Sequence, residues 1–156
     1  MFHVYDRLHL ERIPRRYTIE AGKALTDEWL THSDEGRYDL WVYGPNGFVR
    51  EFRGRIRTRL DAAPEIKLRY STGDLALEII ATNSGTERAI LVVQANAYRS
   101  DGPWSVHVPP GRRISREWSV VASHSWYDFS VRSEDMAWRL AGRIEDGRPG
   151  FSDPAI

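Results

Sequence analysis

The chain has 156 residues, of which 41% are apolar and 28% are charged, so it can fold as one domain or two small ones. Its 22 Lys and Arg balance 22 Asp and Glu. Binding to a phosphate backbone needs a basic excess, so we expect no nucleic-acid partner. The absence of cysteine excludes disulfides, thiolate metal sites and a cysteine nucleophile.

Apolar and polar residues alternate along most of the chain, which is the pattern of half-buried strands. In 37–43, Tyr38, Leu40 and Val42 share one face, and the turn GPNG leads into a second extended run at 48–57. Further strands are predicted at 66–70, 75–81, 89–98, 104–108, 113–121, 126–132 and 138–145. This density of short strands predicts antiparallel sandwich packing.

The two halves of the chain are related by an internal repeat. YDLWVY at 38–43 matches YDFSVR at 127–132, an offset of 89 residues. The same offset pairs Trp29 with Trp118, Gly22 with Gly111 and Pro14 with Pro103. After the YD strand the offset becomes 88, so that FRGRI matches LAGRI at 140–144. Because rare residues recur in one order, we infer a duplicated unit.

The first copy is incomplete, because residues 66–89 have no counterpart in it. We interpret the chain as a piece of a longer polypeptide, cut inside its first repeat; the alternative is a first copy that evolved without these strands. The predicted fold is all-β, with two tandem antiparallel, immunoglobulin-like β-sandwich units. Their predicted bounds are a truncated unit at 1–60, a linker at 61–65, a complete unit at 66–146 and an irregular tail at 147–156.

Five segments, spread along nearly the whole chain, carry the repeat: RRYTIEAGKALTDEW, GRYDLWVYGPNGFVREFRG, ANAYRSDGPWSVHVPPG, SWYDFSV and AGRIEDGRPGFSDPA. They resemble the C-terminal domain of bacterial phosphocholine-preferring phospholipase C. The resemblance implies a tandem accessory module that follows a larger catalytic domain, which hydrolyses phosphatidylcholine or sphingomyelin. It also implies a secreted or periplasmic parent protein. No family catalytic residue can be placed on this chain, because no part of the catalytic domain is in the sequence.

The motifs give no support for catalysis or metal binding by the chain itself. Its five histidines lack the spacing of a metal site. They are His3, His9, His32, His107 and His124. A nucleophile elbow, a P-loop and a dinucleotide fingerprint are all absent from the sequence. We therefore expect no catalytic residue, no metal and no cofactor.

Asp39 and Asp128 follow a tyrosine at equivalent positions of the two copies. They could bind a cation or a quaternary ammonium group. The favoured interpretation is structural, with each carboxylate accepting hydrogen bonds from backbone or arginine beside a buried tyrosine. Aromatic residues at or beside the recurring positions are predicted to lie in the core: Trp29, Tyr38, Trp118, Trp126 and Tyr127.

The best candidates for a binding surface are Trp41, Tyr43 and Phe48. Trp41 and Tyr43 fall on the opposite strand face from Tyr38, and Phe48 follows the next turn. Exposed aromatic rings suit a membrane interface or a quaternary ammonium group. The alternative, slightly favoured, is that Trp41 packs against the other copy or the catalytic domain. A run of arginines is interpreted as a solvated strand edge: Arg50, Arg53, Arg55, Arg57 and Arg59.

The predicted function is that of a non-catalytic accessory domain that braces the N-terminal catalytic domain of its own polypeptide. Contact with a phospholipid surface is a further expected role. The alternative is a stand-alone module that binds carbohydrate or protein. Missing strands would expose a sheet edge, which could pair with a second copy to form a homo-oligomer.

Overall fold

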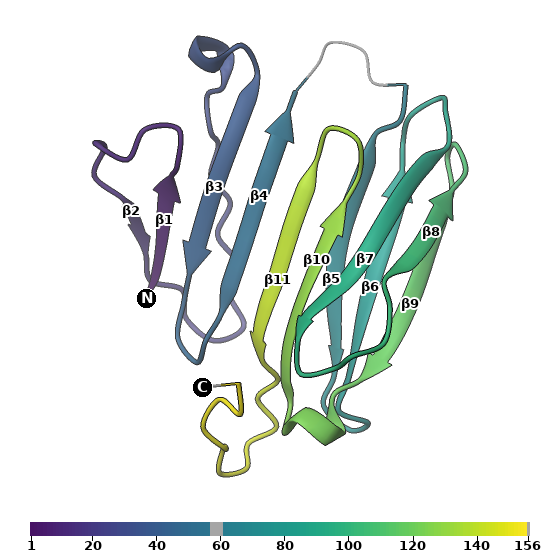
Figure 1. The fold of residues 1–156 in the computed structure, drawn as a ribbon. Coiled ribbons are helices and arrows are strands. Elements are labelled where there is room, and N and C mark those ends of the chain that lie inside the picture. The colour runs from purple at the N-terminus through teal and green to yellow at the C-terminus, as the bar shows by residue number, and fades with distance from the viewer. Residues whose placement is uncertain (57–60, 156) are drawn as a thin grey trace.

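The computed structural model describes residues 1–56 and 61–155, which form two antiparallel sheets (Figure 1). The larger sheet has eight strands in the order β2-β1-β3-β4-β11-β10-β7-β8, and the smaller has the order β5-β6-β9. The bounds are β1 Phe2–Asp6, β2 Arg15–Tyr17, β3 Arg37–Tyr43, β4 Val49–Arg55, β5 Pro64–Ser71, β6 Ala76–Asn83, β7 Ala89–Ala97, β8 Trp104–Val108, β9 Arg113–Ser119, β10 Trp126–Arg132 and β11 Ala137–Arg143. The all-β prediction is confirmed. Among the described residues no helix is long and apolar enough to cross a bilayer.

The second copy has two layers, with β5, β6 and β9 packed on β7, β8, β10 and β11. Alternation along β10 turns Tyr127, Phe129 and Val131 toward the smaller sheet, where each is at most 2% exposed. They join Leu77 of β6 and Trp118 of β9 in one apolar cluster. We call this face of the larger sheet the inner face and the opposite one the outer face. Burial of this cluster is the main apolar contribution to stability.

The strands and 3₁₀ helices of the structure recur at the offset of the sequence repeat. Adding 89 to the residue numbers of β3 gives the residue numbers of β10. The same offset relates the short 3₁₀ helix η1, His32–Asp34, to the 3₁₀ helix η2, Val121–Ser123. Each 3₁₀ helix is followed by a residue in the left-handed region, Glu35 or His124. Likewise β1, β2 and β4 are the counterparts of β7, β8 and β11. Both halves therefore build the same four strands of the larger sheet.

The two copies join through antiparallel pairing of β4 with β11. Glu51 pairs directly with Arg139, and at the offset of 88 these two residues are equivalent. On one side of this pair Arg50 faces Leu140, and on the other Phe52 faces Trp138. At the offset of 88, Arg50 is equivalent to Trp138 and Phe52 is equivalent to Leu140, so each of these two pairs is the repeat equivalent of the other. The contact therefore has the form of an isologous interface about a local twofold axis between Glu51 and Arg139.

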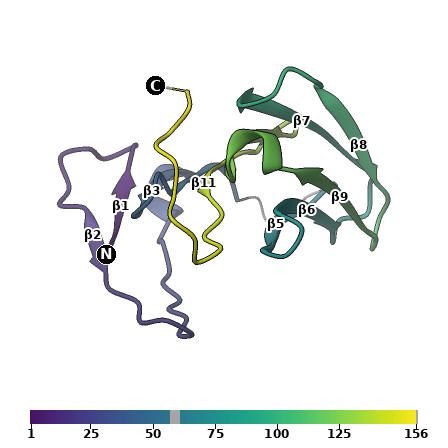
Figure 2. The same ribbon diagram turned by 90° about the horizontal axis from the view of Figure 1, so that it is seen from below.

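The smaller sheet exists only under the second copy. Figure 2 shows it to one side of the larger sheet, and no strand of the described residues lies under β1 to β3. Residues 24–30, the counterpart of β9, form no strand. In the second copy β9 is held by hydrogen bonds to β6, and residues 1–56 contain no equivalent of β6. The expected two sandwich units are therefore one complete sandwich and one single-layered extension of its larger sheet.

Some of the predicted core residues are not in the core. Trp118 is 4% exposed, whereas its equivalent Trp29 is only partly buried, outside any strand, with the Arg15 guanidinium 3.8 Å from its ring centre. The prediction for Trp29 is wrong because the layer that would cover it is missing. Tyr38 and Trp126 are half-buried, while Tyr127 is buried as predicted.

The arginine run is also only partly as expected. Arg53 and Arg55 are exposed, in accord with a solvated edge. Arg50 is buried, so the prediction is wrong there, because β4 is an interior strand joined to β11. Arg57 and Arg59 lie outside the described residues. The strand β5 begins at Pro64, within the expected linker, and no strand follows β11 in the described part of the tail.

The two equivalent tryptophans give a matched test of this asymmetry. Trp118→Ala should lower the free energy of unfolding by about 3–5 kcal/mol, because it leaves a cavity between two sheets. Trp29→Ala should cost about 1 kcal/mol or less, because it removes one partly exposed cation–π contact. Urea denaturation of both variants measures the difference. Equal losses would contradict a missing layer in the first copy.

Candidate functional site

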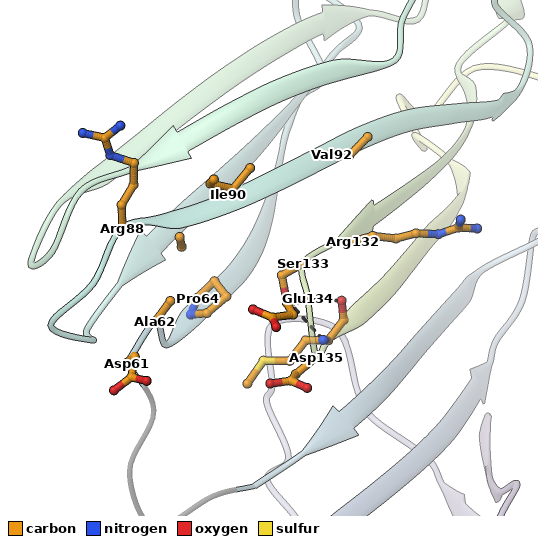
Figure 3. A pocket seen from close by; sticks show the side chains of 12 residues that line it. Asp61, Ala62, Pro64, Arg88, Ile90, Val92, Arg132, Ser133, Glu134 and Asp135 are labelled. Carbon is orange, nitrogen blue, oxygen red and sulfur yellow. Dashed lines mark hydrogen bonds between the residues drawn. The ribbon is translucent and has the colours of Figure 1, made fainter.

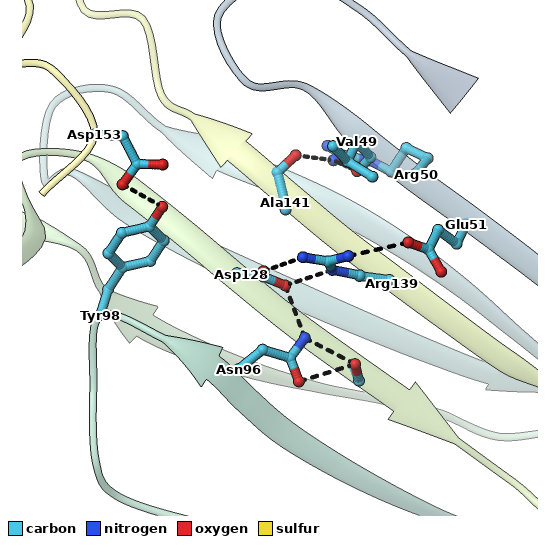
Figure 4. A network of polar contacts seen from close by, with 10 residues as sticks. Val49, Arg50, Glu51, Asn96, Tyr98, Asp128, Arg139, Ala141 and Asp153 are labelled. Carbon is cyan, nitrogen blue, oxygen red and sulfur yellow. Dashed lines mark hydrogen bonds and ion pairs between the residues drawn. The ribbon is translucent and has the colours of Figure 1, made fainter. Parts of the chain in front are cut away.

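A polar network crosses the outer face at the junction of the two copies (Figure 4). Arg139 of β11 binds Asp128 of β10 through two hydrogen bonds, 2.7 and 3.1 Å long, and reaches Glu51 of β4 at 3.1 Å. Asn96 of β7 donates to Asp128 at 2.7 Å and to Ser130 at 2.8 Å. Two bonds to one carboxylate are a strong, oriented pairing. The hydrogen bond to Asp128 is the largest cause that raises the pKa of Arg139.

The first copy repeats this arrangement in a weaker form. Asp39 is the equivalent of Asp128, and Arg7, which contacts it at 3.5 Å, is the equivalent of Asn96. Burial raises the pKa of Asp39, and the nearby Arg7 and Arg53 partly oppose that shift. The geometry of Asp128, which accepts two hydrogen bonds from Arg139 beside the buried Tyr127, fits the structural interpretation; Asp39 has an ion pair with Arg7 and lies beside the half-buried Tyr38. Such paired charges orient strands; they are not arranged as an acid–base couple for catalysis.

A shallow hollow of about 290 Å³ lies over this network. Its walls hold both signs of charge, including Arg7, Arg53 and Arg139 against Asp39 and Glu51. With Arg132 the lining has four arginines and two carboxylates, and Arg7 and Arg139 are paired with Asp39 and Glu51, so the hollow keeps an excess of positive charge. Its geometry suits a joint between strands.

Aromatic residues of the first copy form a cluster beside this network. Tyr43 packs edge-on against Trp41 and Tyr5, with 5.9 Å between ring centres in both pairs. The Arg7 guanidinium lies 4.0 Å from the centre of the Trp41 ring. Tyr43 is 36% exposed and Trp41 is half-buried. We call Tyr5, Trp41 and Tyr43 the outer aromatic cluster.

Phe48 does not belong to this cluster. It precedes β4 on the side of Arg50, whose guanidinium lies 4.2 Å from its ring centre, and packs edge-on against Phe2 at 5.2 Å. Strand alternation places it on the inner side, opposite Trp41 and Tyr43. The structure therefore brings together two of the three predicted binding residues. The structure adds Tyr5 to this surface. In β1 the apolar Val4 faces inward, so strand alternation in the sequence would have placed the neighbouring Tyr5 on the outer face.

Arg50 joins the copies from the inner side. Its guanidinium donates to the Ala141 carbonyl at 2.7 Å, to the Tyr127 hydroxyl at 2.9 Å and to the Tyr70 hydroxyl. The hydroxyls of Tyr70 and Tyr127 are themselves 2.8 Å apart. Burial raises the pKa of Tyr127 well above its ordinary value. Sequence reasoning missed this junction because the contacts join four strands, β4, β5, β10 and β11, that are far apart in the sequence.

A second hollow, of about 550 Å³, lies where the chain enters β5 (Figure 3). Asp61 and Pro64 border one side, Arg88 and Ile90 another, and Glu134 the third. Among the described residues no group of three His, Asp or Glu side chains could hold a metal ion. The histidines are scattered: His9 contacts Asp34 at 2.7 Å, His107 contacts Ser105 at 3.0 Å and His124 stacks on Phe151. This hollow shows no catalytic constellation.

Alkaline unfolding should report the burial of Tyr127. Its pKa is raised in the folded state, so above pH 10 the unfolded chain loses the proton first and stability falls as pH rises. Tyr127→Phe should make this fall shallower by up to about 1.4 kcal/mol per pH unit. Urea denaturation between pH 9 and 12 measures both slopes. Identical slopes in the two proteins would show that Tyr127 ionises freely in the fold.

The outer-face network should show unequal couplings. A double-mutant cycle of Arg139→Met with Asp128→Asn should give a coupling of about 1 kcal/mol, because two hydrogen bonds link a nearly buried carboxylate. The cycle with Glu51→Gln should give about 0.5 kcal/mol, since that pair has one contact and is more exposed. Chemical denaturation measures each term. A larger coupling to Glu51 than to Asp128 would contradict the geometry.

Comparison with known proteins places this architecture in a family. The family model for the C-terminal domain of bacterial phospholipase C matches residues 1–55 and 64–143. The chain is 41% identical over 165 residues to non-hemolytic phospholipase C of Pseudomonas aeruginosa, which covers all of the chain and 23% of that protein. It is 40% identical to non-hemolytic phospholipase C of Burkholderia pseudomallei and 36% to hemolytic phospholipase C of P. aeruginosa, in each case over 92% of the chain and 21% or 22% of the relative. The chain thus spans less than a quarter of each of these relatives. It belongs to the family of bacterial phospholipase C C-terminal domains.

Proposed function

We propose that this chain is the non-catalytic accessory module of a phospholipase C and braces the catalytic domain of the same polypeptide. One observation carries the proposal: the family match runs through nearly all of the chain, yet the chain accounts for only 21–23% of its relatives. The remaining length of such a protein has room for a separate catalytic domain. Hydrolysis of phosphatidylcholine or sphingomyelin would belong to that domain, in a parent protein that is secreted or periplasmic.

The outer aromatic cluster is the surface we assign to this bracing contact. Interface centres are enriched in Trp and Tyr, which bury large areas at small cost in side-chain entropy. The second copy has Ser130 and Arg132 where the first has Trp41 and Tyr43. The strands themselves are common to both copies, so the fold does not require aromatic rings there. A contact with the catalytic domain that only the first copy makes would explain why Trp41 and Tyr43 are aromatic there and their equivalents are not.

A phospholipid surface is the second candidate partner of the same cluster. Trp and Tyr favour the boundary between headgroups and acyl chains, because their rings are apolar and their edges polar. Such a contact would hold the parent enzyme on its substrate layer, where binding energy remote from the reacting bond helps orientation. A stand-alone carbohydrate- or protein-binding role is less well supported, because the relatives are so much longer.

The bracing role is tested in the parent enzyme with Trp41→Ala and Tyr43→Ala together. Loss of an interface anchor typically costs 2 kcal/mol or more, so we expect thermal inactivation to accelerate by roughly 30-fold with little change in turnover at 25 °C. Arg132→Ala, at the position equivalent to Tyr43, is the matched control and should inactivate like the parent. An inactivation rate unchanged in the double variant would reject this contact.

Sedimentation of residues 1–156 with phosphatidylcholine vesicles tests the second candidate. Lipid contact predicts co-sedimentation that is lost in Trp41→Ala and retained in Arg132→Ala, because the interfacial rings lie only on the first copy. Absence of binding to the vesicles would reject the lipid role and leave the bracing contact.

A further inference from the structure

Two backbone edges of the structure face the region under the first copy without a partner strand. β5 pairs with β6 on one side only, and residues 24–30 pair with no strand in the described chain. The edge strand β5 lies at the junction, since Tyr70 at its end contacts Arg50 and Tyr127. A cavity of about 370 Å³ adjoins it there, between Tyr70 and Phe2. Unpaired edges are ready to accept further strands.

The inner face of the first copy is also poorly covered. Tyr127, Phe129 and Val131 are at most 2% exposed, whereas their equivalents Tyr38, Leu40 and Val42 are all only partly buried. Large apolar side chains nearby in the sequence are open to solvent, among them Leu8 at 41%, Leu25 at 51% and Leu30 at 81%. An apolar face of this kind on a single sheet needs a second layer.

Residues 24–30 are held near the place of a β9 equivalent even though they pair with no strand. Asp27 accepts hydrogen bonds from Tyr17 and from Arg15, the latter 2.6 Å long, and both donors belong to β2. These bonds lower the pKa of Asp27 to about 2. The Arg15 guanidinium also lies over the ring of Trp29. The segment is therefore tethered to the larger sheet. Both backbone groups of Glu28 take part in this tether, because its carbonyl accepts from Arg15 at 2.9 Å and its N–H donates to Asp27 at 2.8 Å, so a further strand would have to replace these two bonds.

The local twofold axis determines what would fit. Rotation about the local twofold axis exchanges β4 with β11. The same rotation would place equivalents of β5 and β6 under β3 and β4. There the β6 equivalent would pair with 24–30 as β6 pairs with β9. The β5 equivalent would lie beside β5 and complete a six-stranded lower sheet. Its apolar face would follow the pattern Leu77, Ile79 and Ala81, which covers the inner face in the second copy.

Chain connectivity identifies the source of such a hairpin. β6 enters β7 through the short connection 84–88, and β1 is the equivalent of β7. A hairpin in this place would therefore lead directly into residue 1. The two family matches agree, because the match at 1–55 is 25 residues shorter than the match at 64–143. At the offset of 89 residue 1 is equivalent to residue 90, so the first match lacks a counterpart of 64–89, which contains β5 and β6; the change of offset to 88 accounts for the one residue of difference.

We propose that the inner face of the first copy is a docking surface for a two-stranded hairpin, equivalent to β5–β6, from the polypeptide immediately before residue 1. The hairpin binds by strand addition to 24–30 and β5, and by apolar packing on Tyr38, Leu40 and Val42. The bracing contact uses the opposite face of the sheet, so either proposal can fail without the other.

Hydrogen exchange of the amides of 24–30 tests the docking surface. We compare residues 1–156 with the same chain preceded directly by a second copy of 64–89. Pairing should slow these amides by about 100-fold or more, as in a sheet interior. A control extension with proline in place of its copy of Ile80 cannot pair there and should give no protection.

Hydrogen exchange of the same amides is then measured in the longer natural polypeptide. This second measurement decides the question even if residues 1–156 extended by the copy of 64–89 do not fold. Protection there, absent from residues 1–156, is the expected result. Rapid exchange of 24–30 in the longer polypeptide would overturn the proposal. Protection of residues 1–156 that grows with protein concentration would also overturn it, because a second copy of the chain would then be the occupant.

Discussion

The antiparallel pairing of β4 with β11 is the contact on which the architecture depends. It places Glu51 opposite its own repeat equivalent, Arg139, so that two four-stranded halves become one eight-stranded sheet. Side chains reinforce the joint from both faces. Arg139 connects Asp128 to Glu51 on the outer face, and Arg50 connects Ala141 to Tyr127 on the inner face. Without this pairing each half would present a long unpaired edge, which is a liability for any sheet.

The layer under this sheet shows how the same sequence pattern can give two structures. Trp118 lies in a strand because β6 supplies hydrogen-bond partners to β9 and apolar side chains to the ring. Trp29 sits in an equivalent sequence but lacks that strand, and it is left half-exposed against Arg15. Strand formation at these positions is therefore a property of the neighbouring chain, since a lone strand gains little from its own residues.

Local alternation was enough to predict most strands of the fold. The expected strands at 37–43, 104–108 and 126–132 coincide with β3, β8 and β10. The burial of Arg50 and the contact of Glu51 with Arg139 could not be predicted, because they depend on which edge strands meet across the repeats. The grouping of Phe48 with Trp41 failed because the turn at 44–47 returns the chain in a register that puts the two rings on opposite faces.

A cysteine pair at the twofold axis tests the joining of the two copies most directly, because the natural chain has no cysteine. Residues directly opposite in antiparallel strands lie within the Cα separation that a disulfide spans, about 4.4–6.8 Å. Glu51→Cys with Arg139→Cys should oxidise to a monomer with an internal crosslink, detected by mass spectrometry of the digested protein. The control pair Glu51→Cys with Ser130→Cys, one strand further away on the same face, should stay reduced. A 51–139 pair that links only different molecules, or none, would contradict the shared sheet.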